Sequence, residues 1–499
     1  MPQGGGCKHT LNLADFSQIV MDNATRGSWP FIQQKFPWIV CSPCQPHVLD
    51  LLLEDAGKLE PFKGTLARAR KLAMFLRREK VKATLRELCN LVVALPGETR
   101  FYTQLLLIES LEKVRNKLGP LFAHERVVDY VHANRNDVCD GQTLAELCAA
   151  MEQTTKDGAF WSSLRVIRSF MEPVAKLLQF SESNAPVMGE IYYGWFQLVE
   201  KVKSLDIQPP ALKQQLVGLV ERRWEYGHTC IHGAGYALNP RFVSCDHDEH
   251  ITIALDNFMR RTLAAPPLPQ LPDSMDPLER ETLLSEWRLK KDKADEEMAQ
   301  FSRELLEYRL QRGTFAATNT DVWKNAVVIP PAEWWLIYGG TTPMLRKVAM
   351  RALGQVVGAA EAERTHKVMN NTVTLKRTRL GRQKINKLMR VSINRRTVDK
   401  IMSWQAGKDS NNPALPELGG EEEGEEDDEL PDAWAGVGEP EDEEEREDEA
   451  AAAAALALEH ARRGAQRAAQ LARAPAGRRP LPLTTRSGRS VMASPRLDM

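Results

Sequence analysis

Three residues that could bind a metal ion lie close together near the start of the chain. Cys41, Cys44 and His47 are each separated by two residues, so one turn could bring two thiolates and an imidazole together. Structural zinc sites use such side chains, but they usually need a second ligand pair from elsewhere. The chain offers one at Cys230 with His228 or His232. The simpler interpretation, which we favour, is that Cys44 and His47 stabilise a turn from a strand into a helix.

An acid, Asp22, ends the short apolar run that begins at Gln18. A helical stretch interrupted at Pro30 follows, and then a second apolar run, Trp38–Cys41. Pro46 suits the first turn of a further helix. The order strand, helix, strand, helix predicts an α/β unit with parallel strands. An acid at the carboxyl end of such a strand is where α/β folds place their chemistry.

A strongly basic segment lies at residues 364–396. It contains eleven Lys and Arg residues and no acid, and several of the bases recur at helical spacing. The positive charges of such a segment repel one another unless an anionic partner neutralises them. We therefore predict that basic side chains of this segment contact DNA, namely those of Lys376, Arg377, Arg379, Lys384 and Lys387. The alternative is a basic helix that packs against acids of the body or of the tail and never meets DNA.

Aromatic and apolar residues precede the basic segment. Trp334–Trp335 is followed by an apolar run from Leu345 to Val356 with the i, i+3, i+4, i+7 spacing of a buried helix face. A core helix is the simplest explanation on the local pattern. If the same residues form a surface, they would drive self-association. The candidate dimerisation residues are Trp334, Trp335, Leu345 and Leu353.

Helical patterns cover most of the remaining body. They occupy residues 66–93, the stretch that opens at Thr99–Thr103, and the charged stretch 276–312, while the proline-rich residues 263–275 predict a loop. Residues 421–450 hold 18 acids and one Arg, which is typical of disorder. We find no secretory signal and no run of 18 apolar residues that suits a membrane span. Eight scattered cysteines are typical of a reducing compartment.

Taken in order, these motifs resemble those of hAT-superfamily transposases. The resemblance covers roughly residues 13–400 and rests on V-M-D-N-A, F-P-W-I-V-C-x-x-C-x-x-H, T-R-F-Y-T, W-W-x-x-Y-G and K-R-x-R-L. It implies a catalytic domain with three acids that hold two divalent metal ions. Asp22 matches the second acid, Glu363 the third, and Cys44 with His47 a C-x-x-H pair. Arg100 and Phe101 match a segment whose aromatic residue, where it is Trp, stacks on a flipped DNA base. Phe101 keeps the aromatic face without the indole N–H, and ordinary core packing is an equal alternative for it.

The same resemblance implies the domain organisation. We expect an α/β fold with mainly α content, in which a large all-helical insertion splits a partial RNase H-like core. The expected parts are the partial core at 1–94, the insertion at 95–330, a C-terminal dimerisation region completing the core at 331–404, and a disordered acidic and then Ala/Arg-rich tail at 405–499. The first strands of the family, with the first acid, have no counterpart before Asp22, so we interpret the chain as N-terminally truncated.

These expectations predict a function. Catalysis by two metal ions needs several carboxylates, so Asp22 and Glu363 alone predict a chain without autonomous transposase activity and without a cofactor. Mg²⁺ or Mn²⁺ would bind only in a completed core. We expect a nuclear, hAT-derived protein that binds itself and DNA, with no membrane partner and no small-molecule substrate. A truncated gene model of a fuller transposase is a second interpretation. A third is a non-enzymatic nuclear protein that dimerises and binds basic partners through its acidic tail.

Overall fold

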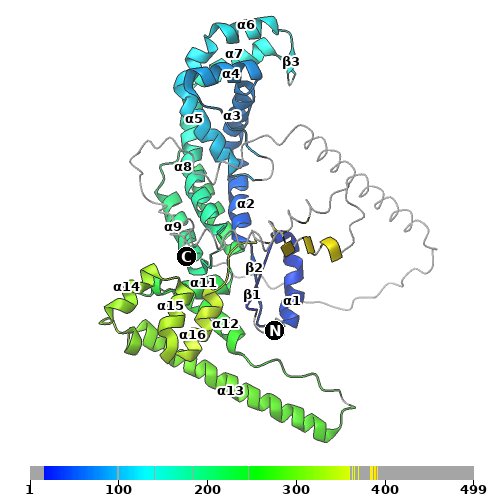
Figure 1. Ribbon diagram of the computed structural model, residues 1–499, viewed down its shortest axis with the longest axis vertical. Coiled ribbons are helices and arrows are strands. Elements are labelled where there is room, and N and C mark those ends of the chain that lie inside the picture. Colours follow the sequence, from blue (N-terminus) through cyan, green and yellow to red (C-terminus); the bar gives the residue numbers. More distant parts are fainter. Residues whose placement is uncertain are drawn as a thin grey trace, which may run out of the picture. The chain divides into compact units, whose positions relative to one another are not determined.

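The computed structural model describes residues 16–97, 100–139, 141–183, 185–245, 247–272 and 274–359, with isolated residues between 362 and 391. These residues belong to one unit of the chain, residues 1–423, and they are mostly helical (Figure 1). The predicted mainly α content is therefore confirmed. The tail predicted at 405–499 lies outside the described residues. None of the described helices has the length and apolarity that crossing a membrane requires.

The described chain begins with an α/β unit. Its elements are β1 (Gln18–Met21), the 3-10 helix η2 (Asn23–Ser28), α1 (Trp29–Lys35), β2 (Val40–Pro43) and α2 (Gln45–Gly57). The two strands are parallel, with Gln18 opposite Val40 and Met21 opposite Pro43. The predicted order of elements and the parallel pairing are confirmed. Pro30 lies in the first turn of α1 and does not interrupt a helix, because the N–H that proline lacks has no helical partner there.

A group of helices follows the α/β unit. Its members are α3 (Phe62–Leu76), α4 (Glu79–Cys89), α5 (Thr103–Phe122), α6 (Glu125–Ala133), α7 (Leu144–Lys156) and α8 (Gly158–Ser181). A short antiparallel pair, β3 (Val138–Cys139) with β4 (Gln142–Thr143), joins α6 to α7. Helix α3 packs against α5, α7 and α8. The helical stretch predicted at 66–93 is thus two helices, separated at Arg77 and Arg78.

Four further helices return toward α2. They are α9 (Met188–Ser204), α10 (Pro210–Gly227), α11 (Cys230–Leu238) and α12 (Glu249–Leu263), with the 3-10 helix η3 (Pro240–Phe242) between the last two. Helix α11 is buried and packs against α9 and α12. A β-carbon at Gly189 of α9 would lie 2.7 Å from the carbonyl oxygen of Gly235 in α11. The two backbones can approach so closely only because both residues are glycine.

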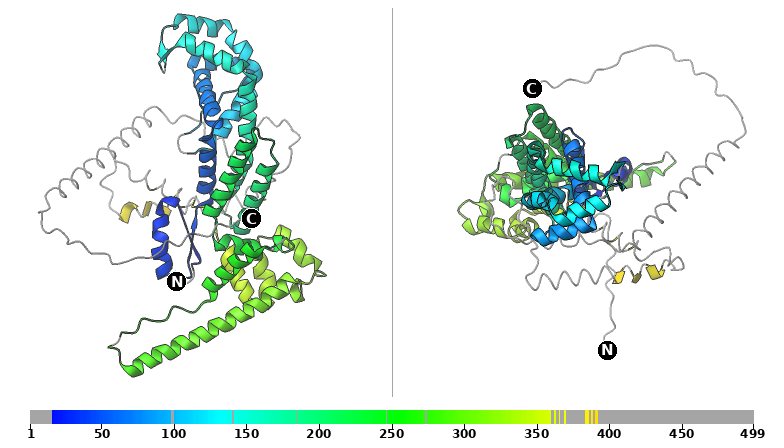
Figure 2. Two further views of the ribbon diagram at one scale, coloured as in Figure 1. Left: turned by 180° about the vertical axis from the view of Figure 1, so that it is seen from behind. Right: turned by 90° about the horizontal axis from the view of Figure 1, so that it is seen from above.

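The last described helices form the C-terminal part of the body. They are α13 (Pro277–Arg309), α14 (Thr320–Val328), α15 (Pro331–Tyr338) and α16 (Pro343–Leu353), with the 3-10 helices η4 (Gly313–Phe315) and η5 (Gly339–Thr341). Asp276 caps α13 by accepting hydrogen bonds from the first-turn backbone N–H groups. Figure 2 shows this long helix and the loop before it, both of which were predicted. Val356 lies beyond the end of α16, which is shorter than the apolar run predicted.

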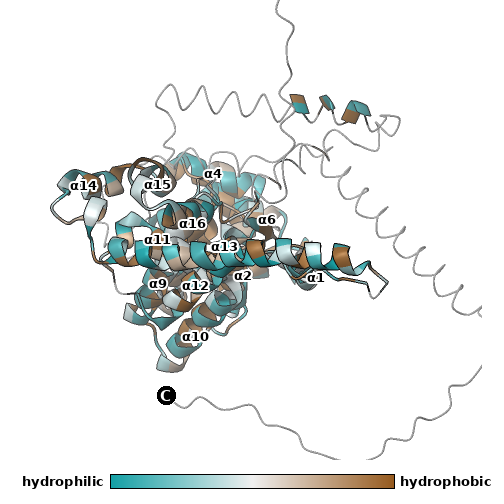
Figure 3. Ribbon diagram, turned by 90° about the horizontal axis from the view of Figure 1, so that it is seen from below, coloured by the Kyte–Doolittle hydropathy of each residue, from teal (hydrophilic) through white to brown (hydrophobic). Residues whose placement is uncertain are grey.

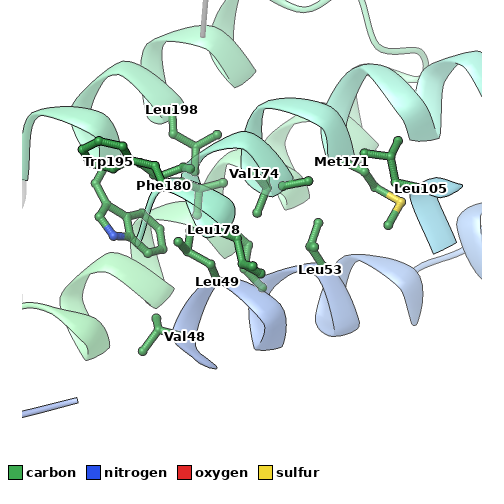
Figure 4. Packing of buried hydrophobic residues seen from close by; sticks show 14 of the residues in the cluster. Val48, Leu49, Leu53, Leu105, Met171, Val174, Leu178, Phe180, Trp195 and Leu198 are labelled. Atoms are coloured by element: carbon green, nitrogen blue, oxygen red, sulfur yellow. The ribbon is translucent and has the colours of Figure 1, made fainter. Parts of the chain in front are cut away.

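Helix α2 connects the α/β unit to the helical groups. Figure 4 shows Leu49 and Leu53 of α2 facing Val174 and Leu178 of α8, with Trp195 of α9 at the end of the same cluster. All five side chains are buried. Burying each large apolar side chain contributes roughly 1.5–3 kcal/mol. This packing fixes the start of α2, where the candidate site residues lie.

Candidate functional site

An acid at the end of β1 meets an imidazole at the start of α2. Asp22 follows β1 directly, and His47 lies in the first turn of α2, just after β2. Because the two strands are parallel, their carboxyl ends lie side by side, and His47 Nε2 is 3.0 Å from Asp22 Oδ1. Both groups are accessible, with 57% of the Asp22 side chain and 35% of the His47 side chain exposed. They form a polar pair at the edge where the sequence predicted chemistry.

Cys44 organises the turn between β2 and α2. Its N–H donates to the carbonyl oxygen of Met21 at 2.9 Å, and its sulfur accepts a hydrogen bond from the N–H of Ala359 at 3.3 Å. The next residue, Gln45, donates its N–H to the carbonyl oxygen of Val357 at 3.0 Å. The turn is therefore in contact with a segment from far along the chain, residues 357–359. These contacts hold Cys44 within the turn, and a structural role of Cys44 with His47 stays a prediction.

Gly358 allows that segment to approach so closely. A β-carbon at Gly358 would lie 3.1 Å from Pro46 Cγ and 3.1 Å from the carbonyl oxygen of Ser181. The chain thus passes between the start of α2 and the end of α8. It leads toward Glu363, the predicted third acid, which lies outside the described residues. What the structure shows is the return of the chain to the turn beside Asp22.

The described side chains do not complete a site for two metal ions. Two cations about 4 Å apart need several oxygen ligands, and here Asp22 supplies one carboxylate beside an imidazole. Within the described ranges, no three His, Cys, Asp or Glu side chains gather in a group that could hold a metal ion. Binding of Mg²⁺ or Mn²⁺ by Asp22 with Glu363 therefore stays a prediction.

The alternative zinc site is not assembled by its candidate ligands, all of which the structure describes. Cys41 is buried in β2, and burial raises the pKa of its thiol, which disfavours the thiolate that binds metal. His232 Nδ1 accepts a hydrogen bond from the N–H of Thr229 at 3.1 Å. The ring of His228 stacks on Trp224 with 4.7 Å between centroids. These side chains are engaged in packing and hydrogen bonds of the helical groups.

Arg100 and Phe101 are held against α2 and the end of α8. Asp50 Oδ1 of α2 accepts a hydrogen bond from the N–H of Phe101 at 2.9 Å, and Arg100 Nη1 is 3.6 Å from Glu182 Oε1. The ring of Phe101 covers Gly57, where a β-carbon would lie 2.1 Å from the ring. Phe101 is half-buried and packs against the core. Core packing is thus observed, and stacking on a DNA base stays a prediction.

Two of the basic residues predicted to contact DNA in the segment 364–396 are described. Lys384 and Lys387 are helical and exposed, as is Arg390 farther along. Spacings of three residues place bases on neighbouring positions of one helix face. The other predicted DNA contacts of this segment, Lys376, Arg377 and Arg379, lie outside the described residues. DNA contact by this segment stays a prediction.

The four predicted dimerisation residues lie inside the chain itself. Trp334, Trp335, Leu345 and Leu353 each have 0% of their surface exposed. Trp335 Nε1 donates to the carbonyl oxygen of Leu238 at 2.7 Å, and Trp334 Nε1 donates to that of Val322 at 2.8 Å. In the single chain these side chains are covered by its own residues, as the core-helix interpretation expects, and their contact with a partner stays a prediction. They hold the C-terminal helices together and attach α15 to α11.

Exposed apolar side chains lie on α15 and on the preceding helix, α14. Val327 and Val328 end α14, and Leu336 and Ile337 lie on α15, with exposed fractions from 53% for Leu336 to 73% for Val328. We call these four residues the α14–α15 surface. Figure 3 shows α14 beside α15, and the two helices are in contact. The sequence pattern does not reveal this surface, because apolar residues of α15 point both inward, as Trp334 and Trp335 do, and outward.

Comparison with known proteins bears on this part of the chain. Residues 316–394 match the model of the hAT family C-terminal dimerisation region. The matched stretch contains α14, α15 and α16, and it starts before the boundary predicted at Pro331. No match was found among the curated proteins. The match supports membership of the hAT family and a capacity for self-association.

Proposed function

We propose that this chain is a hAT-transposase-derived protein that assembles with a second copy of itself through the α14–α15 surface. The observation that carries the proposal is that four exposed apolar side chains lie inside the stretch that matches a dimerisation region. Burial of each such side chain against a partner would contribute roughly 1.5–3 kcal/mol. Scattered single apolar residues need no explanation, but a group of them marks an interaction site.

The charges beside the surface suit a symmetric contact. Lys324 precedes the two valines and Glu333 precedes Leu336 and Ile337, each at i, i+3, i+4 spacing and exposed. Neither charge forms an ion pair within the part of the chain that the structure describes. In a two-fold contact the same surface is used by both copies. Lys324 of one copy can then pair with Glu333 of the other, at the rim of the apolar contact.

The test is the oligomeric state of the full chain. Light scattering after size-exclusion chromatography, at tens of micromolar protein, should show a dimer for the wild type and a monomer for Leu336→Glu/Ile337→Glu. A matched control, Leu278→Glu/Leu289→Glu, places the same charges at exposed leucines of α13 and should leave the dimer intact. A monomeric wild type, or equal disruption by both variants, would contradict the proposal.

We further propose that the α/β unit is part of an RNase H-like core, within residues 1–94, that a helical insertion at residues 95–330 interrupts. Support comes from the parallel pair β1–β2 and from residues 357–359, which return to Cys44 and Gln45 after the insertion. We propose that the chain does not cleave DNA by itself, since among the described residues of this site Asp22 is paired with His47 rather than with another carboxylate.

A nuclease assay tests the second proposal. The purified full chain, given Mg²⁺ or Mn²⁺ and duplex, hairpin or nicked DNA, should leave every substrate intact. Metal-dependent cleavage that disappears in Asp22→Asn would overturn the proposal and assign a catalytic role to this acid. The oligomeric state of Asp22→Asn should equal that of the wild type, because Asp22 is exposed and distant in sequence from the α14–α15 surface.

A further inference from the structure

Helix α3 has a basic outer face and contains no acid of its own. Residues 62–78 contain six Lys and Arg residues and no Asp or Glu. Lys63, Arg70, Lys71 and Arg77 are spaced at i, i+7, i+8 and i+14, which places them on one face of a helix. Lys63, Arg70 and Lys71 are exposed, and Arg77 is half-exposed. We call these four residues the α3 basic face.

The opposite face of α3 is buried and fixes the orientation of the basic one. Its apolar side chains, Leu66, Ala69, Leu72, Ala73 and Leu76, belong to the core. Helix α3 packs against α5, α7 and α8, and Figure 1 shows α5 running beside it. Arg68 points to that side, where it pairs with Asp157 of the α7–α8 junction at 2.8 Å. The basic face is therefore held rigidly toward solvent.

Most charges of this face are available to a partner. Lys63, Arg70 and Lys71 form no ion pair in the described part of the chain. Arg77 uses one nitrogen, Nη1, on the carbonyl oxygen of Val93 at 3.3 Å. The positive charge continues into α4, where Lys82 lies near Arg86 and Arg77. Burial, and then the charges of these two arginines, lower the pKa of Lys82. A cluster of like charges of this kind is more stable when an anion neutralises it.

We propose that the α3 basic face binds the phosphate backbone of duplex DNA. Lys63 and Arg77 are about 21 Å apart along the helix at 1.5 Å per residue, so the face can contact several phosphates of a duplex. The small, exposed Ala67 between the charges lets a backbone approach closely, whereas Gly64 lies beside the carboxylate of Glu60, which a β-carbon there would meet at 3.4 Å. Arginine offers a planar pair of donors that suits phosphate oxygens. This surface is separate from the basic segment 364–396 and from the proposed dimer contact.

A polyanion fits this face better than a folded protein does. Protein interfaces usually have an apolar or aromatic centre inside a polar rim. Here Met74 is the large apolar residue among the exposed positions of α3, and it is 48% exposed. A partner would therefore gain its affinity from charge, which supplies much of the affinity of proteins for phosphate backbones. The chain carries a competing anion in its own acidic run at 421–450.

The experiment measures binding of the full chain to a 30-base-pair duplex by fluorescence anisotropy at several salt concentrations. The variant Lys63→Gln/Arg70→Gln/Lys71→Gln removes three charges from exposed positions. We expect at least tenfold weaker binding at low salt and a slope of log K against log salt that is flatter by about 3, since each lost phosphate contact removes about one unit. Circular dichroism should show an unchanged fold.

A matched variant distinguishes a local surface from overall charge. Arg280→Gln/Lys290→Gln/Lys293→Gln removes the same charge from exposed positions of α13 and should leave both affinity and slope nearly unchanged. Equal losses in the two variants, or an unchanged affinity in the α3 variant, would overturn the proposal. An unchanged affinity is also the result expected if the acidic run covers this face. The dimer state of the α3 variant should equal that of the wild type, which separates this test from that of self-association.

Discussion

Arg241 joins three helices through a buried ion pair. Its Nη1 donates to Glu190 Oε1 of α9 at 2.9 Å, and its other nitrogens donate to the carbonyl oxygens of Ala326 and Val327 at 3.2 Å each. Glu190 is 3% exposed, and burial raises the pKa of its carboxyl group, while Asn239 and Arg241 oppose that rise. Arg241 thus neutralises a buried acid and caps the end of α14.

Replacing Arg241 by methionine should destabilise the fold strongly. The change leaves Glu190 buried without its partner and removes donors from two carbonyl groups, at a cost of about 3–5 kcal/mol. Thermal denaturation followed by circular dichroism should show a clear fall of the midpoint. Arg260→Met is the matched control, because Arg260 pairs with Asp256 on the surface, where ion pairs contribute little. Similar midpoints for the two variants would contradict this account.

His232 predicts a dependence of stability on pH. Burial, more than the neighbouring charge of His228, lowers its pKa to about 3, whereas a histidine in an unfolded chain titrates near about 6.5. As pH falls, the unfolded chain takes up this proton first. The stability contributed by neutral His232 is therefore complete above about pH 6.5 and is lost progressively as the pH falls toward 3.

Denaturation midpoints measured from pH 7 to pH 4 test this expectation. The His232→Asn variant should have a lower midpoint at pH 7, because it loses buried contacts, and a smaller further decrease as the pH falls. The control His250→Asn changes an exposed histidine of α12 and should keep the steep decrease of the wild type. If the wild type and His232→Asn lose stability in parallel, His232 does not control this pH dependence.

At the scale of elements, the contact between α2 and the segment before α5 depends on a glycine. Gly57→Ala places a methyl group where the ring of Phe101 lies, so either the ring or the segment must move, and we expect a lower denaturation midpoint. Gly119→Ala is the matched change within α5, where a β-carbon meets nothing within 4 Å. It should raise stability by about 0.5–1 kcal/mol, because alanine loses less backbone freedom than glycine in a helix. The reverse order of midpoints would show that the contact does not depend on Gly57.

The order of elements could be predicted because local signals are strong in this sequence. The apolar run before Asp22, the proline at the start of α2 and the proline-rich loop before α13 each predicted what the structure shows. The predicted helix ends were less accurate than the predicted order. Nothing in the sequence of residues 66–93 excludes one continuous helix, yet the chain turns between α3 and α4. A turn between well-packed helices is set by their tertiary contacts rather than by local preference.

The faces of helices were harder to predict than their positions. Apolar spacing marks a buried side but does not say whether the same chain or a second copy covers it. A core helix and a dimer contact were therefore both open for Trp334 and Trp335, which the single chain buries. The α3 basic face had a readable signal in the spacing of Lys63, Arg70, Lys71 and Arg77. That signal was hidden by the denser charge at 364–396. The pairing of Asp22 with His47 follows from the parallel strands, which the sequence did predict.

At the scale of the whole molecule, the chain contains a basic segment and an acidic run that can compete with DNA for binding to that segment. Residues 364–396 hold eleven bases and no acid, and residues 421–450 hold 18 acids. Because both belong to one chain, the acids act at a high effective concentration. Deleting residues 405–499 should therefore strengthen binding of duplex DNA at low salt. With about five phosphate contacts, residues 364–396 alone should contribute about −4 to −5 to the slope of log K against log salt in the shortened chain.

A control isolates the charge of the tail from its length. A full-length chain with the acids of 421–450 replaced by Gln and Asn should bind DNA as tightly as the shortened one. Lys384→Gln/Lys387→Gln in the shortened chain should then flatten the slope by about 2, since both side chains are exposed. If neither the full nor the shortened chain binds duplex DNA at low salt, residues 364–396 do not bind DNA. If the full and the shortened chain bind equally, the acidic run does not compete with DNA for the basic segment. A partner of the acidic run would then have to be another molecule.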